Sequence, residues 1–174
     1  MYNFLSVIKG SNPFVDNYIL PKIKDLLDRY KNVLEDDYTT GCFEEFLSKI
    51  SPHLYAGFQD GRFMGFVYLS DWKGGKGEFH SCIVTVCVDR KFRGKPAREA
   101  GKIFVDKIFK YYNLYKMKAL VFENNINVIN FLASLGFKKE GILEGETFKH
   151  NKPVNLLVYS VFNKTYRRNH NGKK

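Results

Sequence analysis

The chain has 174 residues, of which 44% are hydrophobic and 16% aromatic. That length suits one domain with a core buried on both sides of a sheet, and that composition excludes an intrinsically disordered protein. No apolar run approaches the ~18 residues of a membrane span, and the N-terminus lacks a signal-peptide pattern. The three cysteines, Cys42, Cys82 and Cys87, show no metal-ligand spacing. We therefore expect a reduced, cytoplasmic protein without a metal.

The net charge of +10 is concentrated in two segments. The last twelve residues hold five Lys or Arg and no acid, and residues 91–118 hold nine basic residues against Glu99 and Asp106. The first segment predicts a single domain at 1–162 followed by a mobile basic tail at 163–174. This tail either stays solvated or steers nucleic acid or another acidic partner. The second is either a solvated helix face or a surface that attracts a phosphate-bearing ligand.

In chain order, the first half predicts a strand at residues 2–8 and then two helices. The first helix begins near Pro21 and the second follows Thr39 and Thr40. Apolar residues at helical spacing mark both: Leu20, Ile23, Leu27, Tyr30 and Leu34 in the first, and Phe43, Phe46 or Leu47, and Ile50 in the second. Asp60-Gly61 is a tight-turn dipeptide between two apolar runs and predicts a hairpin. The segment 73–76 predicts a second turn, before a long strand at 78–89.

The second half predicts a helix, a short strand at 117–123, another helix and a closing hairpin. The first helix has an apolar stripe at Ala97, Ala100, Phe104, Ile108 and Tyr111. The second has Val128, Leu132 and Leu135 and ends at Gly136, in the position of a left-handed C-cap. The hairpin turns at residues 150–152. Cys82 and Cys87 lie an odd number of residues apart on one strand, so they should face opposite sides and not pair.

Residues 84–101, VTVCVDRKFRGKPAREAG, combine a β-branched strand, a basic turn with a glycine, and the start of a helix. A strand, a tight turn and a helix in this order place backbone N–H groups around a phosphate. Residues 123–141, ENNINVINFLASLGFKKEG, then begin a helix with asparagine and end it with Leu-Gly-Phe.

These two segments, in this order, resemble the GNAT superfamily of N-acetyltransferases, which move an acetyl group from acetyl-CoA to an amine. The resemblance covers roughly residues 53–162, and the last part is similar to the ribosomal-protein N-acetyltransferases. It implies an α/β fold with a mixed, mostly antiparallel sheet, a central splayed pair of parallel strands and flanking helices. It also implies acetyl-CoA as cosubstrate.

The resemblance assigns the cofactor contacts to the long strand, to the turn after it and to the start of the last helix. Backbone groups of Val86, Cys87 and Val88 would bind the pantetheine arm and the acetyl carbonyl, as an added strand would. The phosphates would meet Arg93 and the amides of Gly94, Lys95, Ala97 and Arg98, and Asn125 would open the last helix. Pro96 stands where glycine is usual and has no N–H, and we expect it at the first helical position.

The candidates for proton transfer are His80, Glu123 and Tyr159. His80 shares a strand face with Cys82, and histidine is the residue type that most readily accepts a proton at neutral pH. Glu78 lies farther out, and Glu123 ends the neighbouring strand. The tyrosine that commonly protonates the leaving thiolate in the family is replaced here by Leu132, and Tyr159 is the candidate substitute. Each of these residues also has a purely structural interpretation as part of a strand or the core.

Two functions stay open at this stage. The chain is either an active enzyme that acetylates a protein N-terminus, a lysine, a small amine or an aminoacyl-tRNA, or a degenerate GNAT-fold binding or structural protein of the kind found in tailed phages. Pro96 and Leu132 favour the second function, whereas Arg93, Gly94, Lys95 and Asn125 favour the first. A nucleic-acid-binding module is disfavoured because the aromatic residues follow core spacing. Pairing of a sheet edge with a second copy of the chain also stays open.

Overall fold

The computed structural model of the chain describes residues 1–31, 42–75 and 78–166. Within these ranges, seven strands form one sheet in the order β1-β2-β3-β4-β5-β7-β6. The strands are β1 Tyr2–Ser6, β2 Leu54–Gln59, β3 Arg62–Gly75, β4 Glu78–Val88, β5 Lys116–Phe122, β6 Lys138–Lys149 and β7 Lys152–Phe162. The helical segments are the π-helical turn η1 Val15–Ile19, α1 Leu20–Tyr30, α3 Phe43–Ile50, the 3₁₀ turn η3 Arg90–Phe92, α4 Lys95–Tyr112 and α5 Ile126–Ser134.

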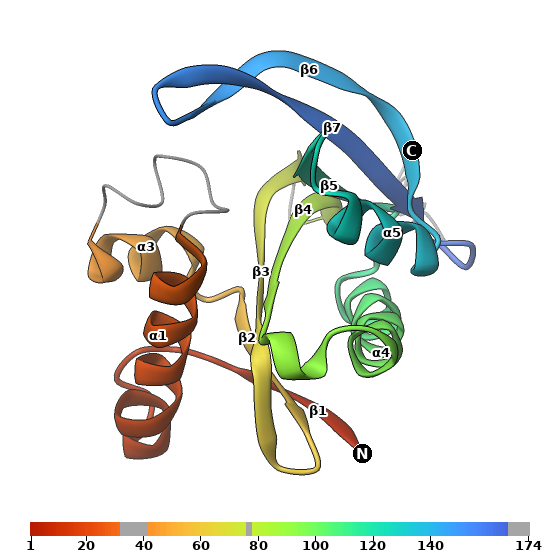
Figure 1. Cartoon of the computed structure of the whole chain (residues 1–174). Helices are drawn as coiled ribbons and strands as arrows, with labels where there is room; N and C mark the ends of the chain where they lie inside the picture. Colours follow the sequence, from red (N-terminus) through yellow and green to blue (C-terminus); the bar gives the residue numbers. More distant parts are fainter. Residues whose placement is uncertain (32–41, 76–77, 167–174) are drawn as a thin grey trace.

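Helices cover the sheet from both sides, as Figure 1 shows. On one side α1 and α3 pack against β2 and β3, and the buried residues there include Ile23, Leu54 and Phe66. On the other side α4 and α5 cover the centre of the sheet over a core that includes Phe104 and Met117. This two-sided burial is the arrangement that the composition predicts.

One pair of strands, β4 and β5, is parallel, and all other neighbouring pairs are antiparallel. Helix α4 connects these two parallel strands, which gives the expected βαβ crossover. The predicted order of elements and the predicted fold class are therefore confirmed.

The predicted turns have the backbone geometry that their residues favour. Asp60 and Gly61, between β2 and β3, have φ angles of 50° and 76°, and His150 and Asn151, between β6 and β7, have 53° and 58°. Two positive φ angles in a two-residue loop match the right-handed twist of the paired strands. Gly136 has a φ of 87° after α5, as expected for a left-handed C-cap.

The cysteines lie where the strand pattern predicts. Cys82 is fully buried in the core under α4 and α5, and Cys87 packs against the core under α1 and α3. The two thiols therefore face opposite sides of β4 and are both free.

Two local predictions are wrong. Residues 73–75 continue β3 instead of forming a turn, and the last residue of the predicted turn, 76, lies outside the described residues. Tyr111 is 74% exposed, and Tyr112 faces inward at the end of α4. The first helix, expected from near Pro21, begins at Leu20 as α1. The turn Val15–Ile19, which was not predicted, precedes it and buries Val15 and Ile19. Thr39 and Thr40, expected before α3, lie outside the described residues.

The first residues of the predicted basic tail contact the domain. Asn163 donates through Nδ2 to the Leu114 carbonyl at 2.9 Å, and the Tyr166 ring lies 5.3 Å from the Tyr115 ring. Residues 167–174 lie outside the described residues, so the basic tail itself stays a prediction. Across the described ranges no helix is both long and apolar enough to cross a membrane.

Candidate functional site

The centre of the sheet contains a gap between β4 and β5. The two strands pair over only three positions, where Ser81, Cys82 and Ile83 lie opposite Lys116, Met117 and Lys118. Beyond Ile83, β4 still pairs with β3 as far as Val88, and β5 still pairs with β7 as far as Phe122. Residues 84–88 therefore lie along a strand edge that faces β5 without a ladder to it, and all five are half-buried. An extended ligand that bears amide groups can satisfy such an edge.

The residues along this open edge of β4 serve the core as well. Val84 and Val86 pack against the core under α4 and α5, and Cys87 packs on the opposite side. Burial raises the pKa of the Cys87 thiol to about 12, so the thiol stays protonated at neutral pH and is a poor nucleophile. The side chains of these residues thus pack, and their backbone is the part that can face a ligand.

Gly65 of β3 keeps the end of β4 in place. A Cβ atom at Gly65 would lie 2.1 Å from the carbonyl oxygen of Cys87 and 2.9 Å from Cα of Val88. Gly65 also has a φ of 153°, which is unfavourable for any residue with a side chain. The course of residues 87–88 along the gap therefore depends on glycine at this position.

The gap is closed at Ile83, where the pairing with β5 ends, and open at Val88. Residues 89–94, called the phosphate turn below because phosphate contacts are predicted there, lead from this open end into α4. Gly94 is the N-cap, with φ 84° and ψ −130°, and Lys95 and Pro96 are the first and second helical residues. The first turn of a helix has N–H groups without an intrahelical acceptor, and its positive dipole end attracts anions. Because proline has no N–H, Gly94, Lys95 and Ala97 supply the donors of this first turn.

Two details of the predicted turn are corrected. Pro96 occupies the second helical position instead of the first. The N–H of Arg98 donates to the Gly94 carbonyl at 3.1 Å and forms the first bond within α4, so this amide cannot also point at a phosphate. The exposed guanidinium is the part of Arg98 that can interact with an anion.

Asn125 is the N-cap of α5, and its Oδ1 accepts from the N–H of Val128 at 3.4 Å. Leu132, at the position of the expected tyrosine, is 3% exposed and packs in the core under α4 and α5. Helix α5 therefore contributes a cap and apolar packing here, with no hydroxyl at position 132.

The structure does not bring His80, Glu123 and Tyr159 together. His80 lies three residues before Ile83, which is roughly 10 Å beyond the closed end of the gap. Glu123 follows β5, and the parallel register places it level with Val88 at the open end. Tyr159 is 9% exposed, pairs with Ala119 and lies among core residues.

A polar cluster that the sequence pattern does not predict lies level with the closed end of the gap. Glu140 accepts through Oε2 from Lys116 Nζ at 2.6 Å and from Ser160 Oγ at 2.8 Å. The hydrogen bond from Lys116 is the main cause that lowers the pKa of Glu140. Lys116 and Lys118 alternate with buried Met117 and Ala119, so these lysines face the side of the sheet away from α4 and α5. That alternation was visible in the sequence, but the bulge in β6 next to Glu140 was not.

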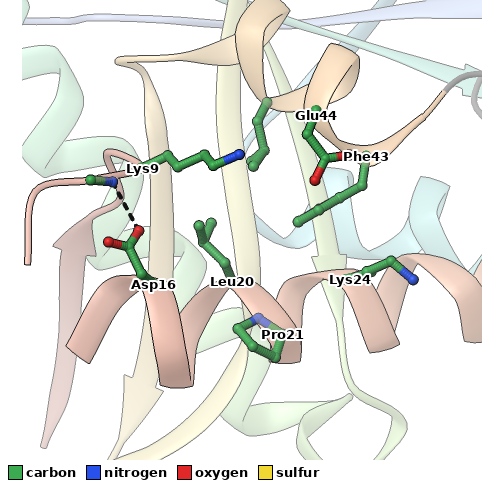
Figure 2. A pocket seen from close by; sticks show the side chains of 9 residues that line it. Lys9, Asp16, Leu20, Pro21, Lys24, Phe43 and Glu44 are labelled. Carbon is green, nitrogen blue, oxygen red and sulfur yellow. Dashed lines mark hydrogen bonds between the residues drawn. The ribbon is translucent and has the colours of Figure 1, made fainter. Parts of the chain in front are cut away.

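A separate hollow of about 380 Å³ lies between α1, α3 and the loop after β1. Its lining is mixed, with apolar Leu20 and Phe43 beside charged Lys9, Asp16, Lys24 and Glu44, as Figure 2 shows. The N–H of Gly10 donates to Asp16 Oδ1 at 2.8 Å across one side. None of the predicted site residues lines this hollow, so the gap between β4 and β5 remains the candidate site.

A comparison with protein families matches residues 20–158 to the acetyltransferase (GNAT) domain. The chain belongs to the GNAT acetyltransferase family. The match covers both the gap and the phosphate turn, and it confirms the resemblance carried by residues 84–101 and 123–141. No match is found among curated protein sequences.

Solved structures share the fold at low sequence identity. The ribosomal-protein-S5-alanine acetyltransferase from Vibrio fischeri superposes with a TM-score of 0.72 at 18% identity, covering 96% of both chains. YncA, a putative acetyltransferase from Salmonella typhimurium solved with its cofactor acetyl-CoA, gives 0.67 at 16% identity, with 92% of this chain and 93% of that chain covered. RimJ from Mycobacterium smegmatis, solved with CoA-disulfide, gives 0.73 at 16% identity, with 96% and 84% covered. Acetyl-CoA is thus the cosubstrate that family membership indicates.

Proposed function

We propose that this protein transfers the acetyl group of acetyl-CoA to a primary amine. The observation that carries the proposal is the open edge of β4 at residues 84–88, which leads directly to the helix N-terminus at Gly94. An arm with amide groups fits the first feature and a pyrophosphate fits the second, and CoA joins the two in one molecule.

The chain's own residues then have distinct roles. Backbone groups of Val86, Cys87 and Val88 hydrogen-bond the arm and orient the acetyl carbonyl. The N–H groups of Gly94, Lys95 and Ala97 bind the pyrophosphate, and the charges of Arg93 and Arg98 add attraction that salt screens.

The reaction is a direct attack. The amine nitrogen forms a bond to the thioester carbonyl carbon, the carbon–sulfur bond breaks, and the thiol and an amide are the products, with one proton lost from the nitrogen. Without a tyrosine at position 132 the thiolate leaves unassisted, which costs about 10²–10⁴ in rate where general acid catalysis is otherwise used.

The proton acceptor is assigned by placement. The phosphate turn follows the open end of the gap, so an arm that runs from this turn along β4 carries the thioester toward the closed end. Glu123 and Asn125 lie at the open end, Tyr159 lies in the core, and exposed His80 lies beyond the closed end. We therefore favour His80, acting through water, over Glu123. In the pH profile of kcat/KM, His80→Gln should remove the limb of the base and Glu123→Gln should leave it in place. The opposite result would assign the base to Glu123.

Cofactor binding is tested by isothermal titration with acetyl-CoA and CoA. Gly94→Asp adds a negative charge at the phosphate site, and Gly94→Asn adds a side chain of the same shape without the charge. Both variants strain the same positive φ, so their difference reports the charge alone. We expect Gly94→Asp to bind both ligands several-fold more weakly than Gly94→Asn, and the difference should shrink in high salt. No binding of CoA by the unmodified protein at millimolar concentration would overturn the proposal.

A second function, binding without transfer, is favoured by Leu132 and Pro96. Leu132 fills the core where a hydroxyl is expected, and Pro96 removes one N–H from the phosphate turn. The release of free CoA thiol from acetyl-CoA is measured with protein N-termini, lysine peptides, polyamines and aminoacyl-tRNA as acceptors. Tight CoA binding with no amine-dependent thiol release would favour this second function.

The acceptor class is proposed only as a primary amine. The Vibrio fischeri neighbour is named for the alanine of ribosomal protein S5, and other neighbours are named for spermidine. The same acceptor panel therefore includes an alanine-started peptide and spermidine, and the larger kcat/KM identifies the class.

A further inference from the structure

The end of α1 contacts the turn that joins β4 to α4, although the two lie 60 residues apart in the sequence. The Arg29 guanidinium donates through Nη1 to Asp89 Oδ2 at 3.0 Å. The N–H of Arg90 donates to the Tyr30 hydroxyl at 3.1 Å. The guanidinium carbon of Arg93 lies 4.9 Å from the centroid of the Tyr30 ring. Three residues of the turn thus rest on two consecutive residues of α1.

Asp89 holds the beginning of this turn. Its Oδ1 accepts from the N–H of Lys91 at 3.0 Å and its Oδ2 accepts from Arg29, so both carboxylate oxygens are used. Its own N–H donates to the Met64 carbonyl of β3 at 2.8 Å. The bond from Lys91 is the main cause that lowers the pKa of Asp89, which keeps the carboxylate charged. The turn is therefore held to β3 and to α1 at its first residue.

Arg93 is held at the other end of the turn, next to the Gly94 N-cap. An exposed arginine otherwise samples many rotamers, and a guanidinium stacked on an aromatic ring is restricted to few. The C-terminal end of α1 also carries the negative end of a helix dipole, which favours nearby cations such as Arg90 and Arg93. The Tyr30 ring thus restricts the guanidinium of the residue that directly precedes the Gly94 N-cap.

We propose that Tyr30 is a positioning residue for the cofactor phosphates, acting through Arg93, with Arg29 and Asp89 holding the turn in register. This inference rests on the proposed function, because it concerns how the same turn binds acetyl-CoA. A guanidinium that is already stacked loses less rotamer freedom when it binds a phosphate. The contact with Tyr30 should therefore increase the affinity for the phosphate-bearing part of the ligand.

The test compares acetyl-CoA with S-acetylpantetheine, which keeps the arm and the thioester but lacks the pyrophosphate and the ribose phosphate. Tyr30→Leu removes the ring, and Tyr30→Phe keeps the ring but loses the hydroxyl. Tyr18→Leu is the matched control, because Lys22 Nζ lies 4.6 Å from the centroid of that ring in a similar contact. Tyr18 lies in η1, outside the phosphate turn.

We expect Tyr30→Leu to bind acetyl-CoA about two- to fivefold more weakly and S-acetylpantetheine unchanged. Tyr30→Phe should lose less, and Tyr18→Leu should lose nothing. In an Arg93→Ala background the further effect of Tyr30→Leu should shrink to the loss that Tyr30→Phe shows, because only the hydrogen bond from the Arg90 N–H then remains to be lost.

A second variant leaves α1 unchanged, so it serves if Tyr30→Leu does not fold. Arg93→Lys keeps the charge and loses the planar group that stacks on Tyr30, and it should weaken acetyl-CoA binding to a similar degree. Equal affinity of Arg93→Lys and the unmodified protein, or equal weakening of both ligands by Tyr30→Leu, would overturn the inference. If the unmodified protein does not bind acetyl-CoA at all, the proposed function is refuted as well. The two outcomes above differ from this one, because they overturn only the inference about Tyr30.

Discussion

Replacing Gly65 with alanine tests whether the end of β4 is held as tightly as the structure indicates. The new Cβ atom would lie 2.1 Å from the Cys87 carbonyl oxygen, and ordinary contact begins near 3.4 Å. The two strands would therefore have to separate by about 1.3 Å, because the atoms that clash belong to the backbone and have no rotamer to change. The bond from the Asp89 N–H to the Met64 carbonyl, 2.8 Å long, would lengthen beyond hydrogen-bond distance.

The expected cost combines three terms. A residue with a side chain at a positive φ costs about 1–2 kcal/mol, overpacking costs about 1–3 kcal/mol, and a lost hydrogen bond costs about 1 kcal/mol. The sum is about 3–6 kcal/mol, which lowers the Tm of a protein of this size by roughly 6–24 °C. Acetyl-CoA affinity should fall as well, because the same displacement moves Cys87 and Val88 along the gap.

Gly10→Ala is the control for this experiment. Gly10 has a φ of 79° and a Cβ there would meet no atom within 4 Å, so the substitution adds the backbone strain without the clash. Differential scanning calorimetry of both variants separates the two terms. If Gly65→Ala melts within about 2 °C of Gly10→Ala and binds acetyl-CoA equally well, the contact between β3 and β4 is not what holds the gap.

Two further predictions concern pH and the C-terminus. Burial lowers the pKa of His53, which contacts the Tyr112 hydroxyl at 3.1 Å, so the unfolded chain binds a proton more readily than the folded one and stability should fall as the pH drops below about 6.5. The Tm difference between pH 7.5 and 5.5 should therefore be larger for the unmodified protein than for His53→Gln, and an equal difference would contradict this. Deleting residues 167–174 should change the Tm by no more than about 2 °C. Deleting 163–174 should lower it further, because the Asn163 and Tyr166 contacts are lost, and equal melting of both truncations would show that these contacts add nothing.

The fold was predictable because the apolar spacing and the turn residues indicate the same helices and strands along the chain. Ala100, Phe104 and Ile108 are buried as their helical spacing predicts, and Asp60-Gly61 and Gly136 occupy positions that need positive φ. The failures are equally local. Two glycines at 74–75 suggest a turn, yet they lie in a strand whose partner continues beside them, because ladder bonds outweigh the weak propensity of glycine.

The backbone features proposed to bind the cofactor were predictable, and the placement of the catalytic candidates was not. Gly94 and the half-buried strand before it are backbone features, and a short motif determines them. Which side chains meet across strands depends on register, and register depends on bulges that leave no clear sequence signal. His80 and Glu123 illustrate this, since the three paired positions of β4 and β5 place them beyond opposite ends of that pairing.

This division between backbone and side chains also explains how the family fold persists at 16–18% identity to its solved neighbours. Recognition of the cofactor by N–H and C=O groups needs a strand edge, a glycine N-cap and a helix N-terminus, and many sequences satisfy these conditions. Pro96 is tolerated because the first turn keeps the N–H groups of Gly94, Lys95 and Ala97. Leu132 is tolerated because its position is also a core position under α4 and α5, where an apolar side chain packs well. Side chains are then free to diverge at the places that select an acceptor and move its proton.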